Sequence, residues 1–240
     1  MKGHVVNSTS RTARGYQARR FGAKPMNDAN RRPVAARGWN INQLLARWLV
    51  GADVTPNQIS IASVGFSALA ALCLIQFPLN RAGIWWLSLL AVALILGRGL
   101  CNILDGLVAI EGGKRTASGE LFNDLPDRIS DVLVLAAAGY ATNVVSWAPE
   151  AGWACAMLAV MTAYVRTLGR GLGAGSDFRG PMAKAQRMTA IVVALVLTPF
   201  EALFWPQGYF LLAALVAIIL GCIVTIWRRA ERIYRVLEGK

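Results

Sequence analysis

Long apolar runs separated by short polar connections dominate the chain from residue 54 onward. Several runs approach the ~20 residues that an α-helix needs to cross the hydrocarbon core of a bilayer. None shows the strict alternation that is typical of a membrane-spanning strand. The pattern predicts an all-α polytopic membrane protein. Its six transmembrane helices are expected at residues 57–77, 83–110, 118–141, 149–171, 187–204 and 208–228.

A shorter apolar pattern precedes the first of these helices. In residues 38–53 apolar side chains recur at helical spacing, and Pro56 separates this segment from the next run. Such a segment suits an amphipathic helix that lies in the membrane interface. Residues 1–37 carry nine Lys and Arg against one Asp, which predicts a largely disordered basic tail. We therefore expect a membrane domain over residues 54–228, followed by a second basic tail over residues 229–240.

The distribution of basic residues predicts the orientation. The first, third and fifth connections between the predicted helices hold one basic residue together, Arg81, whereas the second and fourth hold Lys114, Arg115, Arg179 and Lys184. Cytoplasmic connections carry the excess of Lys and Arg in membrane proteins. Both termini and the even-numbered connections are thus expected on the cytoplasmic side, with a bacterial inner membrane as the expected location.

The net charge of +12 has two possible explanations. Nucleic acid would be the expected partner of a soluble protein with this charge. In a membrane protein, basic flanks on one side bind anionic lipids, so we expect the membrane and no nucleic acid. The cysteines sit at wide spacings inside apolar runs without any CxxC pair, which favours small buried side chains over a zinc site.

Carboxylates are concentrated beside the second connection. Residues 101–131 hold Asp105, Glu111, Glu120, Asp124, Asp127 and Asp131. Ionisable groups in membrane helices usually face the bundle interior or a water-filled cavity. The helical period places Arg98, Asn102, Asp105 and Ala109 on one face of the second helix, and Gly119, Asn123, Asp127 and Asp131 on one face of the third. An antiparallel pairing of these two helices would bring the faces together.

That pairing predicts polar layers at different depths. Asp105 with Asn123 or Asp124 is expected nearest the cytosol, Asn102 with Asp127 next, and Arg98 with Asp131 deepest. The outer layers offer only oxygen ligands, which suit Mg²⁺ or Mn²⁺. An unpaired arginine is costly at depth. We therefore expect a structural ion pair between Arg98 and Asp131, with contact between Arg98 and a donor phosphate as the alternative.

This spacing resembles the signature of the CDP-alcohol phosphotransferases, D-x2-D-G-x2-A-R, a spacer, then G-x3-D-x3-D. The corresponding residues are Asn102, Asp105, Gly106, Ala109, Ile110, Gly119, Asn123 and Asp127. The stretches TPNQIS at 55–60 and RGPMAKAQR at 179–187 add to the likeness, which covers roughly residues 39–228.

The resemblance implies a phosphotransferase that synthesises phospholipid. It would move a phosphatidyl group from a CDP-linked lipid donor, with CDP-diacylglycerol expected, to a small alcohol or polyol phosphate, and release CMP. Glycerol 3-phosphate and an inositol phosphate both remain open as acceptors, and so does a soluble CDP-alcohol donor with a lipid acceptor. The family also implies a homodimer.

The resemblance further assigns roles by position. Asp127 would be the catalytic base. The metal ligands would be Asp105, Asn102, Asn123 and Asp127. The small residues Gly106, Ala109 and Gly119 would leave room for the nucleotide donor. Phosphate of the acceptor would be bound by Arg166, Arg170, Arg179 and Lys184.

The sequence departs from the signature at Asn102, Asn123 and Ile110. Two carboxylates are thereby lost where the family has four, and the signature arginine is absent. A weakened relative that binds nucleotide or lipid as a membrane partner protein is therefore the alternative function. An ion or proton transporter would use buried carboxylates too, but it would not require Gly106 and Gly119 at signature spacing.

Overall fold

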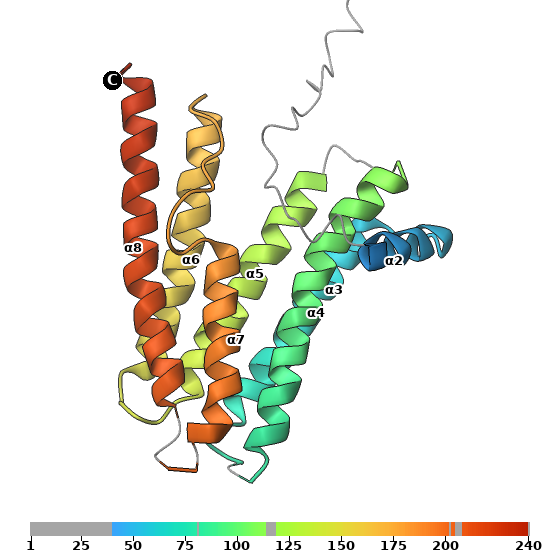
Figure 1. Ribbon diagram of the computed structural model, residues 1–240. Coiled ribbons are helices and arrows are strands. Elements are labelled where there is room, and N and C mark those ends of the chain that lie inside the picture. Colours follow the sequence, from blue (N-terminus) through green and yellow to red (C-terminus); the bar gives the residue numbers. More distant parts are fainter. Residues whose placement is uncertain (1–39, 81, 114–118, 202, 205–207, 240) are drawn as a thin grey trace, which may run out of the picture. The chain divides into compact units, whose positions relative to one another are not determined.

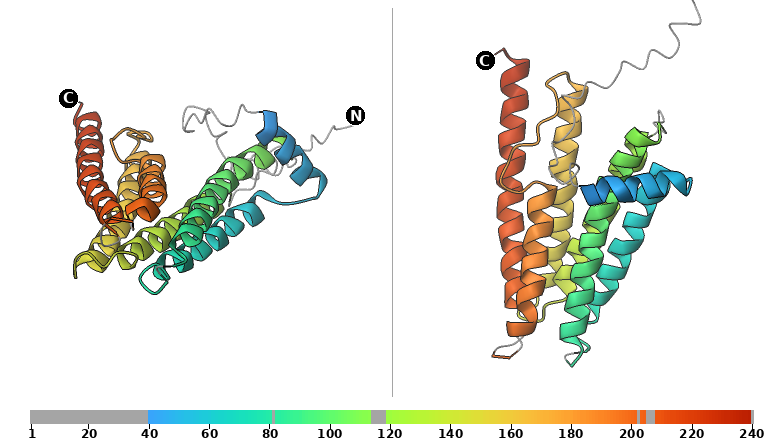
Figure 2. Two further views of the ribbon diagram at one scale, coloured as in Figure 1. Left: turned by 60° about the horizontal axis from the view of Figure 1, so that its bottom comes forward. Right: turned by 45° about the vertical axis from the view of Figure 1, so that its right-hand side comes forward.

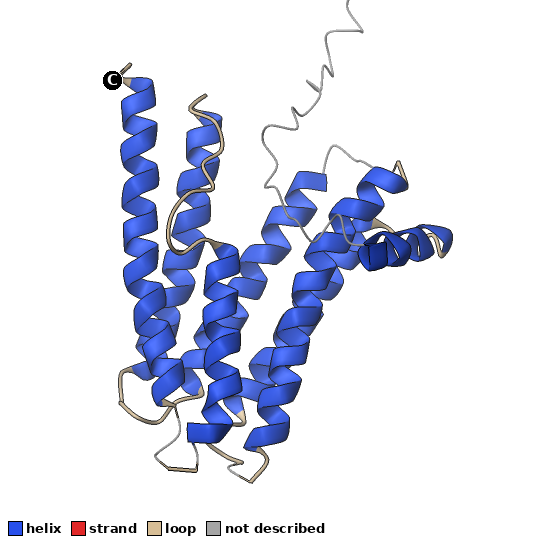
Figure 3. Cartoon of the chain, viewed as in Figure 1, coloured by secondary structure: helices blue, strands red, loops and turns tan. Residues whose placement is uncertain are grey.

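The computed structural model describes residues 40–80, 82–113, 119–201, 203–204 and 208–239. All regular secondary structure among them is helical, as the sequence predicts (Figure 3). The helices are α2 (Asn40–Gly51), α3 (Pro56–Ile75), α4 (Ile84–Glu111), α5 (Gly119–Tyr140), α6 (Ala148–Gly171), α7 (Lys184–Glu201) and α8 (Tyr209–Leu237) (Figure 1). The expected basic tail over residues 1–37, and Arg81, Lys114 and Arg115, lie outside the described residues.

Four helices, α3, α4, α6 and α8, are long and apolar enough to cross a membrane. The remaining two candidates are α5, with 22 residues, and α7, with 18 residues. Both carry buried charged side chains, Asp127 and Asp131 on α5 and Arg187 on α7. Six spanning helices therefore stay a prediction from the sequence.

α3 is the helix that joins the two halves of the polar site. It packs along both α4 and α5, whereas α4 and α5 do not pack side by side along their lengths. The expected direct pairing of these two helices is thus wrong. The buried face of α3 is built from small residues, including Ser60, Ser63 and Ser67, which let both neighbours approach it closely. Side chains from α4 and α5 meet beside α3.

The remaining packing joins helices that are adjacent in the chain and helices that are not. α5 packs on α6, α6 on α8, and α7 on α8 and α4. A continuous core of buried Ala, Leu, Ile and Val side chains runs through these contacts. The cysteines, Cys73, Cys101, Cys155 and Cys222, are all buried and free, as their place in apolar runs predicts.

The backbones of α5 and α6 touch at two glycines. A Cβ atom on Gly139 would lie 2.6 Å from the carbonyl oxygen of Ala148, and a Cβ atom on Gly152 would lie 2.9 Å from Cα of Gly139. Real Cβ atoms do not come this close to backbone, so only glycine allows the observed distance between the helices.

Gly139→Ala is expected to destabilise the protein by about 1–3 kcal/mol, because the added methyl group must push α6 away. Gly65→Ala is the matched control, since nothing lies within 4 Å of a Cβ atom at Gly65 on α3. The control should gain about 0.5–1 kcal/mol from its lower backbone entropy in the unfolded chain. Thermal unfolding of both variants in detergent checks the prediction, and equal unfolding temperatures would contradict it.

α2 crosses α4 at a steep angle (Figure 2). Its buried residues are Asn42 and Ala46, whereas Ile41, Leu44 and Trp48 are 63%, 67% and 69% exposed. These three apolar side chains are spaced for one helix face. The face that they form is suited to the membrane interface, and that location stays a prediction.

α8 differs from the expected span at its C-terminal end. The helix does not stop at residue 228 but continues to Leu237, so the expected basic tail over 229–240 is mostly helical. At the other end, the carboxylate of Glu201 accepts hydrogen bonds from the backbone N–H groups of Gly208, Tyr209 and Phe210 at 3.2, 2.7 and 3.5 Å. These are donors that the first turn of a helix leaves unsatisfied, so Glu201 caps α8 from the end of α7.

Candidate active site

Two signature carboxylates share one polar interior beside α3. Asp105 on α4 and Asp127 on α5 are 5% and 7% exposed, and they lie close enough for their charges to interact. Asp105 Oδ2 accepts a hydrogen bond of 2.8 Å from Oγ of Ser60 on α3. Three helices therefore position the pair, and the signature spacing alone would not have indicated the serine.

The other signature residues are less buried than this pair. Asn102 is half-buried on α4, one turn before Asp105, and Asn123 is exposed on α5, one turn before Asp127. Gly106, Ala109 and Gly119 are all half-buried, and Ile110 is 45% exposed. Ile110 therefore faces away from the buried interior.

Asp127 is surrounded by cations. The ammonium group of Lys184, the first residue of α7, donates a hydrogen bond to Asp127 Oδ1. Nη2 of Arg98 lies 4.0 Å from the same oxygen, and Nη2 of Arg128 lies 3.7 Å from Oδ2. Lys184 was expected at the acceptor phosphate, and in this structure it contacts the expected catalytic base. No pattern within α5 or α7 alone could have indicated this contact.

Below Asp127 lies a buried charge network centred on Asp131, which is fully buried. Arg98 Nη2 and Arg187 Nη2 lie 2.5 and 2.8 Å from its two oxygens. The first contact is the expected one, and the second, from α7, was not anticipated. Arg187 also donates to Oγ1 of Thr162 on α6 at 3.1 Å. The network thus ties α4, α5, α6 and α7 together at one depth.

Asp124 does not form the expected layer with Asp105. Nη2 of Arg166, on α6, donates to its two carboxylate oxygens at 3.1 and 3.3 Å. α5 packs against α6, so this pair joins two neighbouring helices. The guanidinium of Arg166 also lies over the ring of Phe178, 5.5 Å from its centroid.

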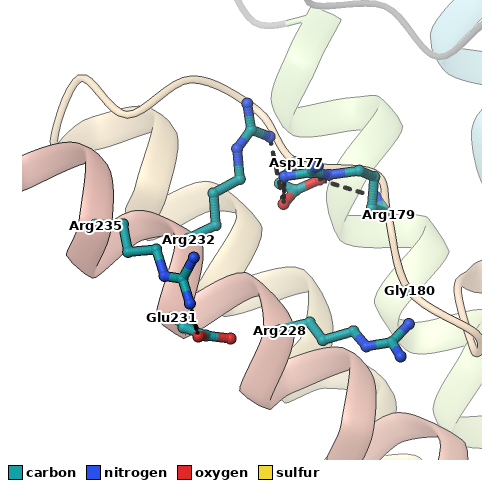
Figure 4. Close-up of a pocket in the computed structure, with 7 residues that line it drawn as sticks. All are labelled: Asp177, Arg179, Gly180, Arg228, Glu231, Arg232 and Arg235. Carbon is teal, nitrogen blue, oxygen red and sulfur yellow. Dashed lines mark hydrogen bonds and ion pairs between the residues drawn. The ribbon is translucent and has the colours of Figure 1, made fainter. Parts of the chain in front are cut away.

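Arg179 lies at a cavity of its own. This cavity has a volume of about 390 Å³ and lies between α8 and the loop that follows α6 (Figure 4). Its lining residues are Asp177, Arg179, Gly180, Arg228, Glu231, Arg232 and Arg235. The basic residues expected to bind acceptor phosphate therefore do not gather at one point, since Arg166, Lys184 and Arg179 each contact a different carboxylate.

Asp177 holds two of the cavity's arginines. It lies 3.2 Å from Nε of Arg179 and 3.3 Å from Nη1 of Arg232, as the dashed lines in Figure 4 show. Burial by itself raises the pKa of Asp177. The hydrogen bonds from the backbone and side chain of Arg179 and from Arg232 outweigh that effect, so the pKa lies below its ordinary value. The carboxylate is charged near neutral pH and orders the loop against α8.

The signature residues can be tested as ligands of a metal ion. Asp105, Asp127, Asn102 and Asn123 offer carboxylate and amide oxygens, which suit Mg²⁺ or Mn²⁺. Within the described part of the chain, no three His, Cys, Asp or Glu side chains gather as a metal-binding group. Two carboxylates balance the charge of one divalent ion. A second ion would add to the positive charge of Lys184, Arg98 and Arg128, so the donor set fits one.

Comparison with known proteins agrees with this architecture. No protein-family model matches the chain, and a search of curated proteins found no match. The chain is similar in structure to the Mycobacterium tuberculosis phosphatidylinositol phosphate synthase PgsA1. The TM-score is 0.68, at 21% identity over 82% of this chain and 94% of PgsA1, for the structure with CDP-DAG bound.

Two further PgsA1 structures match to a similar degree. The complex with manganese and citrate gives a TM-score of 0.67 at 21% identity, over 80% of this chain and 88% of PgsA1. The apo form gives 0.64 at 20% identity, over 80% of this chain and 95% of PgsA1. PgsA1 is a CDP-alcohol phosphotransferase. At these identities the likeness establishes a shared fold, and it is the fold of a protein in the family whose signature this sequence resembles.

Proposed function

We propose that this protein is a CDP-alcohol phosphatidyltransferase of the membrane. It transfers a phosphatidyl group from a CDP-linked donor, CDP-diacylglycerol, to the hydroxyl group of an alcohol acceptor and releases CMP. One observation carries the proposal. Asp105 and Asp127, at signature spacing on different helices, are both buried and lie close enough for their charges to interact. The shared fold supports it, because one of the similar PgsA1 structures has CDP-DAG bound.

The reaction requires a base and a leaving group. The oxygen of the acceptor hydroxyl attacks the β-phosphorus of the donor, and its proton passes to the carboxylate of Asp127. The bond from the β-phosphorus to the bridging oxygen breaks, and CMP leaves with that electron pair. Lys184 must first release Asp127 Oδ1, which it contacts in this structure. General base catalysis by a positioned carboxylate contributes about 10²–10⁴-fold.

Asp105, Asn102, Asn123 and Asp127 would hold one Mg²⁺ or Mn²⁺, which would offset charge on the diphosphate when bound. Gly106, Ala109 and Gly119, which lack bulky side chains, would leave room for the nucleotide beside these residues. A similar PgsA1 structure contains manganese, which supports a divalent cofactor.

The acceptor is a small alcohol or polyol phosphate, with glycerol 3-phosphate and an inositol phosphate as the two candidates. Its phosphate would compete with Asp124 for Arg166. Arg170, one turn after Arg166 in α6, and Arg179 would extend the basic surface. We propose that the site opens to the cytoplasmic side of a bacterial inner membrane, and that the protein works as a homodimer.

The proposal is tested by CMP release from CDP-diacylglycerol. Purified protein in lipid nanodiscs is supplied with Mg²⁺ or Mn²⁺ and with each candidate acceptor in turn. We expect release that requires both an acceptor and a divalent ion. Absence of release with every acceptor, together with thermal stabilisation by CDP-diacylglycerol, would remove the proposal. This result would favour the alternative function, a partner protein that binds nucleotide or lipid. The neutral residues Asn102 and Asn123 and the contact of Lys184 with Asp127 suggest that alternative.

A further inference from the structure

The charges around Asp127 do not resemble those of a site built for two divalent cations. Its Oδ1 accepts a hydrogen bond from Lys184 and lies 4.0 Å from Nη2 of Arg98, and its Oδ2 lies 3.7 Å from Nη2 of Arg128. Asp105 is the other carboxylate among the four signature positions, because Asn102 and Asn123 are neutral. Cationic side chains of the protein itself therefore already offset much of the negative charge at this site.

The three cations differ in how freely they can move. Arg98 is 1% exposed and is held by Asp131 at 2.5 Å. Arg128 donates to the carbonyl oxygen of Asp124 at 3.4 Å. Lys184 keeps 24% of its side chain exposed, and among the described residues its carboxylate contact is to Asp127. Its flexible four-carbon stem allows the ammonium group to turn from Asp127 to a neighbouring phosphate oxygen.

The position of Lys184 suits an anionic ligand. It is the first residue of α7, where the unsatisfied backbone N–H groups and the helix dipole favour negative charge. The half-buried side chain lies beside the carboxylate of Asp127. A diphosphate bound next to Asp105 and Asp127 would therefore come within reach of this ammonium group.

We propose that Lys184 serves as a built-in counter-cation. The site takes one divalent ion, and the Lys184 ammonium group binds the diphosphate of the CDP-linked donor, supplying positive charge that a second ion would otherwise bring. The inference rests on the proposed function for the identity of the ligand. The charges support it, since the loss of two carboxylates at positions 102 and 123 matches the loss of one divalent ion.

Mn²⁺ binding tests the first half of the proposal. Electron paramagnetic resonance of the purified full chain in nanodiscs, titrated with Mn²⁺ alone, should show one bound ion per chain. The combined variant Asn102→Asp, Asn123→Asp and Lys184→Met should bind two, because it restores two carboxylates and removes the ammonium group. Two ions bound to the unaltered chain would overturn the proposal, and so would none.

CDP-diacylglycerol binding tests the second half. Lys184→Met should weaken it about tenfold to hundredfold, the range expected for one charge-assisted hydrogen bond, with Mn²⁺ stoichiometry still at one. Lys184→Arg should retain most of the affinity, because it keeps the positive charge. If the aliphatic part of the lysine side chain mattered only for packing, the larger arginine would not be expected to preserve binding. Arg47→Met is the control for net charge, since Arg47 is 72% exposed and pairs with Glu111. Unchanged affinity in folded Lys184→Met would overturn the proposal.

The two proposals fail separately. One bound Mn²⁺ and weakened CDP-diacylglycerol binding in Lys184→Met, without CMP release from any acceptor, would support the counter-cation and remove the transferase. CMP release by a chain that binds two Mn²⁺ ions would do the reverse. If Lys184→Met does not fold, Lys184→Gln replaces it in the binding experiment, and the stoichiometry of the unaltered chain still decides the first half.

Discussion

Asp127→Asn is expected to lower the rate of CMP release about 10²–10⁴-fold, because the amide cannot take the proton of the acceptor hydroxyl. The side chain keeps nearly the same volume, so the 7% exposed site should stay packed. The variant should also bind Mn²⁺ more weakly, since one of two carboxylates is lost. Initial rates of CMP release at saturating donor and acceptor measure the effect on the chemical step.

Glu111→Gln is the matched control for Asp127→Asn. It makes the same carboxylate-to-amide change at the end of α4, where Glu111 lies 3.7 Å from the exposed Arg47. Its rate should equal that of the unaltered chain. A full rate in Asp127→Asn would exclude Asp127 as the base.

Asp131→Ala is expected to destabilise the folded protein by about 3–5 kcal/mol, the cost of removing one partner from a buried ion pair. The reason is that Arg98 and Arg187, each 1% exposed, would both lose their carboxylate. Glu231→Ala removes one partner of an exposed pair, in which Arg235 and Glu231 are 63% and 43% exposed, and should cost about 0–1 kcal/mol. Thermal unfolding in detergent and the yield of folded protein compare the variants.

A compensating variant shows whether Asp131→Ala destabilises the protein by leaving two arginines unpaired or by removing packing contacts. Asp131→Ala combined with Arg98→Met and Arg187→Met removes all three charges of the network and should recover most of the stability, because apolar replacements of a buried ionic group are often neutral or stabilising. If Asp131→Ala costs no more than Glu231→Ala, the network is not a stabilising element.

The positions of the helices could be predicted from the sequence, because each long apolar run between polar connections corresponds to one buried helix. The facing of Asp105 and Asp127 could be predicted too, since the helical period fixes which side chains share a face. The ion pair between Arg98 and Asp131 could be predicted because an unpaired charge in apolar surroundings carries a high free-energy cost. Each of these inferences needs one or two helices only.

Properties that depend on a third helix could not be predicted. The period of α5 places Asp124 near the polar face but does not say that Arg166 of α6 will pair with it. The contact between Lys184 and Asp127 could not be predicted either, because the two residues are separated by more than 50 positions and the long lysine side chain can reach many neighbours. The place of α3 between α4 and α5 depends on small residues such as Ser63 and Ser67, whose role is visible only once the helices are packed.

The length of α8 has a consequence for how the protein sits in a bilayer. Its 29 residues extend about 43 Å, whereas a typical hydrocarbon core is about 30 Å thick. Arg228, Arg232 and Arg235 lie on the last part of this helix and line the arginine-rich cavity. A thicker bilayer would draw these guanidinium groups toward the acyl chains, and a thinner one would leave them in water. Hydrophobic mismatch is therefore expected to act first on the arginines at this end of α8.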